Sequence, residues 1–123
     1  MLWYSDVLSF IGDGFAMTGM VYRHEPMGAL PIGHYSLMNL ENLNVKEEMS
    51  YNYDTMLHVY PTAGMDYSVL SDREKAILDK VIEKFKNYKA KDIVDYMHEE
   101  KAYIETNAGE IIPFSLAKEI RSF

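Results

Sequence analysis

The amino-acid sequence predicts an α+β fold that is mainly helical, forms a single domain and carries a small antiparallel sheet or hairpin. Apolar residues recur at helical spacing in residues 2–11 and again in residues 72–88. Between these stretches, residues 45–51 and 55–60 are rich in β-branched and aromatic side chains around a turn at 52–54, a pattern typical of a hairpin. A chain of 123 residues has the length of one domain.

The composition limits the classes of function. The chain has no cysteine, so it offers neither a disulfide, nor a thiolate metal site, nor a thiol nucleophile. Its net charge of −7 opposes non-specific binding to phosphate backbones, and we expect no direct nucleic acid binding by this segment. We see neither an apolar run near the ~20 residues of a membrane span nor a secretion signal. A cytoplasmic protein without a membrane partner is therefore expected.

The first third of the chain begins with the helix over residues 2–11, which Gly12-Asp13-Gly14 ends as a turn. No capping residue precedes this helix, so we expect a longer protein in which the helix starts earlier. Glycine and proline interrupt the following residues, where we expect a short strand over 20–24 and then an ordered loop up to Pro31. Apolar residues after the loop predict a short helix over 32–43.

The predicted hairpin is marginal by itself, because two strands bury little surface. We expect it to pack against helices or to gain a third strand, for which residues 20–24 are the candidate. Pro61 closes its second strand, and a loop is expected over residues 61–67.

The second half of the chain predicts helices. Ser71-Asp72-Arg73-Glu74 has the pattern of a capping box, and the helix behind it over residues 72–88 has an apolar stripe on one face. The stripe consists of Ile77, Leu78, Val81, Ile82 and Phe85. A second helix is expected over residues 90–98, and a closing helix over 114–120 after an extended pair at 111–112.

Residues 98–106 begin like the helix of a zinc protease, with His98 followed by Glu99. Zinc binding would need a second histidine one helical turn on, where the chain has Ala102. The four histidines show no other ligand spacing, so we expect neither a metal nor a cofactor. His98 is expected to bond locally and cap the turn, and Tyr103 either to pack in the core or to anchor a partner.

Five short motifs follow one another along the chain. They are Leu2-Trp3-Tyr4-Ser5-Asp6, Thr18-Gly19-Met20-Val21-Tyr22, Pro26-Met27-Gly28-Ala29-Leu30-Pro31, Leu70-Ser71-Asp72-Arg73-Glu74 and His98-Glu99-Glu100-Lys101-Ala102-Tyr103. In order and spacing they resemble the Panacea domain, a SocA-like or GepA-like family often labelled phage-associated, over nearly the whole chain. Two positions depart from the family pattern: Ala29 stands where proline is usual, and Tyr103 where tryptophan is frequent.

The resemblance implies a non-enzymatic antitoxin domain that binds and neutralises a cognate protein toxin. Neutralisation is expected to be direct or, as in SocA-like members, to use the domain as an adaptor that delivers the toxin to a Clp-type protease. Residues 1–123 are expected to form the Panacea domain, and an upstream DNA-binding region stays an open alternative, because similar proteins often carry one. The interaction residues expected from the motifs are Tyr4, Asp6, Thr18, Tyr22, Met27, Pro31, His98, Glu99 and Tyr103.

Two further function classes stay open on the sequence alone. One is a sensing or dimerisation domain of a prophage-associated transcriptional regulator, which would form a homodimer. The other is a hydrolase, for which the only motive is His98 beside Glu99 and Glu100. The nine methionines and ten tyrosines are expected mostly to fill the core, with an adaptable binding surface as the alternative.

Overall fold

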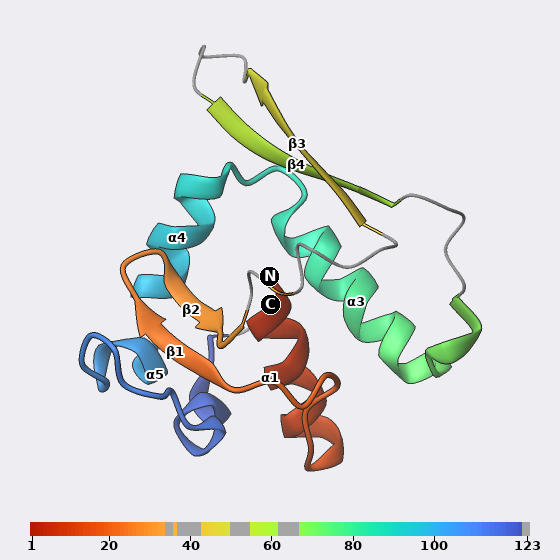
Figure 1. The fold of residues 1–123 in the computed structure, drawn as a ribbon. Coiled ribbons are helices and arrows are strands. Elements are labelled where there is room, and N and C mark those ends of the chain that lie inside the picture. The colour runs from red at the N-terminus through yellow and green to blue at the C-terminus, as the bar shows by residue number, and fades with distance from the viewer. Residues whose placement is uncertain (34–35, 37–42, 50–54, 62–66, 122–123) are drawn as a thin grey trace. The chain divides into compact units, whose positions relative to one another are not determined.

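The computed structural model describes residues 1–33, 36, 43–49, 55–61 and 67–121. The chain forms two compact units. One unit consists of Met1–Ile32 together with Leu70–Phe123, and the other of Gly33–Val69. The described residues form helices and small antiparallel hairpins, which confirms the predicted α+β class (Figure 1).

Helix α1 (Leu2–Asp13) confirms the first predicted helix. Its buried face includes Trp3 and Val7, which join the core. The helix ends because Gly14 takes a φ of 85°, a left-handed conformation that glycine adopts without strain. The Gly14 N–H then bonds to the carbonyl of Phe10, one of the last carbonyls that the helix itself leaves unpaired.

Strands β1 (Tyr22–Glu25) and β2 (Gly28–Pro31) form an antiparallel hairpin. The sequence predicts a strand over residues 20–24 and then a loop up to Pro31. The prediction of a loop is wrong, because residues 28–31 form a second strand that pairs with β1. Pro26 and Met27 are the two central residues of the turn between the strands, and proline is common at the first of these positions. Gly28 follows with a φ of 112°. On the other edge of β1, Arg23 bridges to Ile111, which confirms that the segment at 111–112 is extended.

The second unit contains strands β3 (Leu43–Met49) and β4 (Thr55–Pro61), with Val45 opposite Val59. The predicted hairpin is thereby confirmed, to within two residues at each end. The expectation of a third strand from residues 20–24 is wrong, because β1 pairs with β2, and β3 and β4 form a separate two-stranded sheet among the described strands.

A 3₁₀ helix, η1 (Tyr67–Val69), ends this unit. Most of the helix predicted over 32–43, the turn predicted at 52–54 and most of the loop predicted over 61–67 lie outside the described residues.

Helix α3 (Asp72–Phe85) begins with the predicted capping box. The Ser71 hydroxyl accepts the Glu74 N–H at 3.1 Å, and the Ser71 N–H donates to the Glu74 carboxylate at 2.9 Å. The helix ends three residues before the predicted end at 88. Val81 and Phe85 are buried as the stripe predicts, whereas Ile82 is 54% exposed.

Helix α4 (Ala90–His98) has the predicted bounds. The acidic, aromatic segment after it forms a single helical turn, α5 (Lys101–Ile104). The predicted closing helix is the 3₁₀ helix η2 (Phe114–Glu119). Within the described part of the chain, we find no helix that is both long enough and apolar enough to cross a bilayer.

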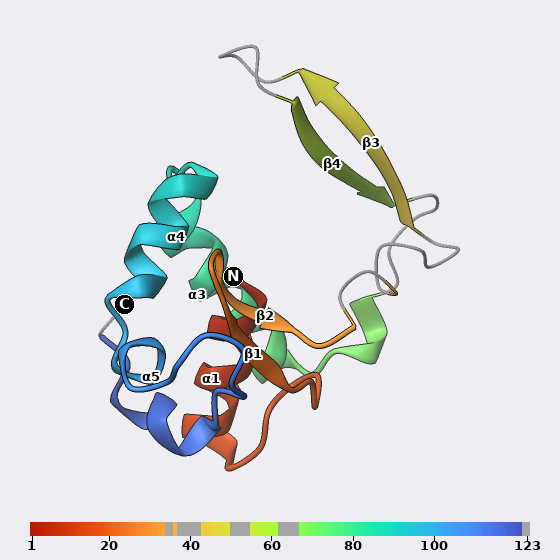
Figure 2. The same ribbon diagram turned by 60° about the vertical axis from the view of Figure 1, so that its left-hand side comes forward.

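The core of the first unit forms where α1 contacts α3, β2 and η2, and α4 contacts β2 and α5. Within this unit, α1 lies in the middle (Figure 1; Figure 2). The buried apolar residues are Trp3, Tyr4, Val7, Tyr22, Val81, Phe85, Met97, Ala102, Ile112 and Ala117. Two of the predicted interaction residues, Tyr4 and Tyr22, therefore belong to the core.

Candidate functional site

The carboxylate of Asp6 ties the segment after α1 back to the helix. Asp6 is 0% exposed, and its two oxygens accept three hydrogen bonds. The donors are the Thr18 N–H at 2.8 Å, the Thr18 hydroxyl at 2.5 Å and the Tyr22 hydroxyl at 2.6 Å. A buried carboxylate needs such bonds in place of the water that it loses. Asp6, Thr18 and Tyr22 thus form one group, the Asp6 cluster, which joins the first two motifs.

Glu100, in the turn between α4 and α5, is the second buried carboxylate and is 1% exposed. Its Oε1 accepts a hydrogen bond from the Tyr4 hydroxyl at 2.9 Å. Arg121 approaches with its Nε 3.4 Å from Oε1 and its backbone N–H nitrogen 3.3 Å from Oε2. The guanidinium also bonds to Glu99 at 2.8 Å and to the Tyr96 carbonyl, and its Cζ lies 3.8 Å from the centre of the Tyr96 ring.

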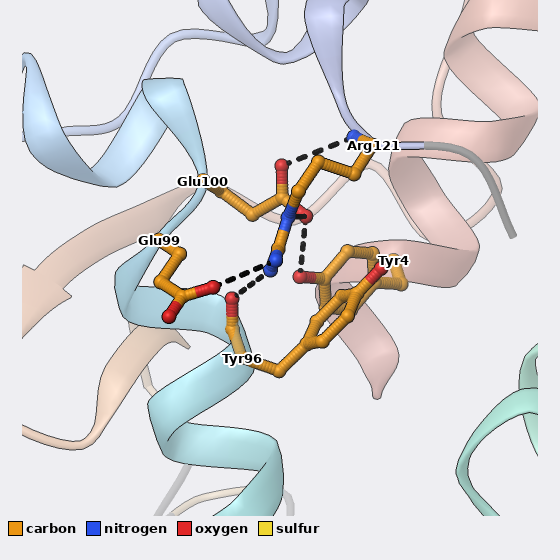
Figure 3. Close-up of polar contacts among 5 residues, drawn as sticks. All are labelled: Tyr4, Tyr96, Glu99, Glu100 and Arg121. Carbon is orange, nitrogen blue, oxygen red and sulfur yellow. Dashed lines mark hydrogen bonds and ion pairs between the residues drawn. The ribbon is translucent and has the colours of Figure 1, made fainter.

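Figure 3 shows Arg121 in the middle of these five residues, which we call the Glu100 cluster. The cluster joins α1, the end of α4 and the segment after η2, three parts of the chain that are far apart in sequence. Arg121 is a single positive charge beside two carboxylates, those of Glu99 and Glu100, so it offsets their negative charge only in part. The cluster therefore fastens the C-terminal segment of the described chain to the rest of the first unit.

Both buried phenols stay protonated. Burial first, and then the charge and hydrogen bond of Glu100, raise the pKa of Tyr4. Burial first, and then the hydrogen bond to Asp6, raise the pKa of Tyr22. A protonated phenol can donate its hydrogen to a carboxylate, so Tyr4 and Tyr22 both remain hydrogen-bond donors across the neutral pH range.

Three aromatic rings form a stack beside the β1–β2 hairpin. The ring of Tyr103 lies 3.7 Å from that of His24 at 16°, and 4.6 Å from that of His98 at 13°. Two rings cannot occupy the same face of a third, so Tyr103 lies between the two imidazoles. We call this group the ring stack. It joins β1, the end of α4 and α5.

Hydrogen bonds fix both imidazoles of the ring stack. The carbonyl of Pro26 can only accept, so His98 donates to it from Nε2 over 2.9 Å. The Thr106 hydroxyl donates its hydrogen to the carbonyls of Ala102 and Tyr103 in α5. Its oxygen can therefore accept a hydrogen bond from Nδ1 of His24, at 2.9 Å. The expectation that His98 bonds locally is wrong, because its acceptor is 72 residues away, and the C-cap of α4 is Glu99.

The turn between β1 and β2 is fastened to α4 and α5. The Tyr103 hydroxyl donates to the carbonyl of Glu25 at 2.7 Å, and His98 holds the next carbonyl, that of Pro26. Gly28, the residue after the turn, packs so closely against α4 that a Cβ there would lie 3.1 Å from Cγ of Met97. Between these fastened residues, Met27 is 63% exposed.

The structure divides the predicted interaction residues into two groups. The buried ones, which hold the fold together, are Tyr4, Asp6, Tyr22 and Pro31. The ones that reach the surface wholly or in part are Thr18, Met27, His98, Glu99 and Tyr103. Contact of any of them with a partner stays a prediction. Sequence reasoning missed Arg121, which lies outside every motif, and the central role of Glu100, which sequence does not distinguish from the neighbouring Glu99.

Two pockets lined by described residues lie at the C-terminal end of α1. One, of about 370 Å³, is lined by Ser9, Asp13, Phe15, Ala16, Met17, Ser71 and Glu74. The other, of about 420 Å³, is lined by Phe10, Ile11, Gly14 and Lys118. Neither pocket includes a residue of the ring stack. Within the described ranges, no three His, Asp or Glu side chains are grouped closely enough to hold a metal ion.

These features define a small α+β domain whose polar motif residues are bonded to one another across the fold. The comparison with protein families matches residues 1–103 to the antitoxin SocA-like, Panacea domain family. The chain belongs to this family, which confirms the resemblance carried by the motifs and supports a role of the toxin–antitoxin type in general. Comparisons with curated proteins and with solved structures gave no match.

Proposed function

We propose that this chain is the antitoxin of a toxin–antitoxin pair and acts by binding a cognate protein toxin. Its membership of the antitoxin SocA-like family over residues 1–103 is the observation that carries the proposal. The protein is proposed to work without catalysis, as a scaffold that presents a surface to the toxin.

The bonding of the motif side chains supports binding in preference to catalysis. A general base must reach a proton of the substrate, within about 3 Å or through one water. The oxygens of Asp6 and Glu100 are instead directed at hydroxyl and N–H groups of the chain itself. His98 is likewise engaged by a backbone carbonyl and by the ring of Tyr103.

Two routes of neutralisation begin with the same complex. In the direct route, the bound antitoxin blocks the toxin. In the adaptor route, it delivers the toxin to a Clp-type protease. In both, the net charge of −7 favours a toxin with a basic contact surface, because opposite charges steer two proteins together.

Co-expression with the toxin encoded beside this chain tests the proposal. We expect growth to be restored and the two proteins to co-purify. Failure of both would contradict the proposal.

The stability of the toxin in cells separates the two routes. Under the adaptor route, the toxin half-life should shorten when the chain is present, and deletion of the protease should abolish protection. Under the direct route, protection should persist without the protease and the toxin level should not fall.

A further inference from the structure

Met27 is an apolar side chain presented by a rigid turn. Its neighbours on both sides are fastened: the carbonyls of Glu25 and Pro26 by Tyr103 and His98, and Gly28 by its packing against α4. Met27 itself remains 63% exposed. The turn therefore fixes the backbone of Met27 and leaves its side chain to solvent.

Such a fixed turn lowers the cost of binding. Ordering a loop or a flexible side chain at an interface costs conformational entropy, and a contact whose backbone is already ordered avoids part of this cost. The fastening of the turn draws on both α4 and α5, through the two hydrogen bonds from the ring stack. These long-range contacts position the two residues that connect β1 and β2. The two strands themselves are only four residues long each.

Exposure alone would not distinguish Met27. Single exposed apolar side chains are ordinary on protein surfaces, and Ile82 on α3 is 54% exposed. Met27 differs because it stands at the apex of a turn, whereas Ile82 lies along a helix. A flexible, polarisable thioether at an apex fits into a concave apolar site on a partner.

The charge of the chain indicates which charge the partner should carry around its apolar site. Glu25 directly precedes the turn, and the chain as a whole carries a charge of −7. A pocket with a basic rim would complement this charge and would make association depend on salt.

We infer that the toxin is bound through the Met27 turn, which is Pro26 and Met27 between the flanking residues Glu25 and Gly28, with Met27 inserted into an apolar pocket of the toxin that has a basic rim. This inference rests on the proposed function and adds the contact face to it. Centrally buried anchor residues carry most of the energy of an interface, while charges at its rim mainly change the association rate. The role of Met27 as an anchor is therefore measured by the dissociation rate, and the role of the basic rim by the salt dependence of the association rate.

Binding kinetics of the purified toxin on immobilised chain test the inference. We expect Met27→Glu and the milder Met27→Gln to weaken binding about tenfold or more, mainly through faster dissociation. Added salt should slow association of the unchanged chain. Ile82→Glu is the matched control and should bind like the unchanged chain. All three variants should keep the unfolding temperature of the unchanged chain, because both side chains are largely exposed.

A conservative change in the support of the turn gives an independent test. Tyr103→Phe keeps the ring between the imidazoles and removes the hydroxyl that holds Glu25. We expect faster amide hydrogen exchange at Met27 and Gly28, together with weaker toxin binding. Both Met27 variants binding within about twofold of the unchanged chain would overturn the inference and leave the proposed function intact. Absence of binding by the unchanged chain would overturn the proposed function, and the inference with it.

Discussion

The hydroxyl of Tyr4 lies 2.9 Å from Oε1 of Glu100, across 96 residues of sequence. Both side chains are 1% exposed, and Arg121 approaches both oxygens of the same carboxylate. The contact joins the first helix to the turn between α4 and α5. The acidic pair that follows His98, and that is the motive for the hydrolase alternative, therefore includes a residue that holds the first unit together.

Replacing Arg121 should expose the dependence of Glu100 on its cation. Arg121→Ala leaves a buried carboxylate without its positive partner, and we expect a loss of about 2–3 kcal/mol in the free energy of unfolding, since Arg121 itself is partly exposed. Adding Glu100→Gln to this variant removes the uncompensated charge and should restore part of the loss. Urea unfolding measures both. If the second substitution made the protein still less stable, the ion pair would not be the source of the loss.

Stability should fall in alkali because two phenols are held protonated. The pKa values of Tyr4 and Tyr22 are raised above 10.0, first by burial. A raised pKa in the folded state gives stability that is complete below the unfolded pKa and is lost as the pH rises above it. Unfolding by urea should therefore give a constant free energy near pH 8–9 and a declining one above about pH 10. The Tyr4→Phe, Tyr22→Phe double variant should start lower and decline less, and an equal decline in both proteins would refute this explanation.

The Asp6 cluster should behave as a unit. Tyr22→Phe and Thr18→Val each remove one hydroxyl donor to the same carboxylate, and each should cost about 1.5 kcal/mol of unfolding free energy. Because both hydroxyls serve one buried charge, the double variant should deviate from additivity by about 0.5 kcal/mol or more. Chemical unfolding of the four proteins in the cycle measures this coupling. Strict additivity would mean that the two bonds act independently.

His98 should matter for stability. His98→Ala removes the bond to Pro26 and one face of the ring stack, and we expect a loss of about 1–2 kcal/mol. His98→Gln can restore a hydrogen-bond donor but not the ring, so its stability should lie between that of the unchanged chain and that of His98→Ala. Thermal unfolding of the three proteins gives the order. A fully stable His98→Ala variant would contradict the structural role of this side chain.

Gly28 should tolerate a side chain less well than Gly14. Both have positive φ, 112° and 85°, so alanine strains the backbone at either position, by about 1 kcal/mol. Only at Gly28 does the new Cβ meet Met97, whereas nothing lies within 4 Å at Gly14. Gly28→Ala should therefore lower the unfolding temperature more than Gly14→Ala. When both glycine substitutions are made in a chain that also carries Met97→Ala, the difference between their effects on the unfolding temperature should become smaller. Equal losses in the two single variants would leave no role for the Met97 contact.

The helices could be predicted because their signals are local. The Ser71–Glu74 capping box fixes the start of α3, and the apolar spacing before His98 fixes α4. Strand β2 was not predicted, because it begins with Gly28 and ends with Pro31, and these two residue types are typical of turns and loops. Its pairing with β1 comes from the turn and from contacts with α4, which the sequence does not display.

The clusters were only partly visible in the sequence for a related reason. Motif order brings Asp6, Thr18 and Tyr22 to attention, but their shared carboxylate is a fact of three-dimensional packing. Arg121 lies outside every motif, so nothing in the sequence links it to Glu100. The fastening of the Met27 turn likewise depends on His98 and Tyr103, which lie more than seventy residues further along the chain.

The most direct measurement of the central claim is the binding of the purified chain to its proposed toxin, purified as the product of a neighbouring gene. Size-exclusion chromatography with light scattering and titration calorimetry would be applied to the two proteins and their mixture. We expect a single complex of defined stoichiometry and a saturable heat of binding. Separate elution of the two proteins together with no heat of binding would contradict the claim that this chain is a toxin-binding antitoxin.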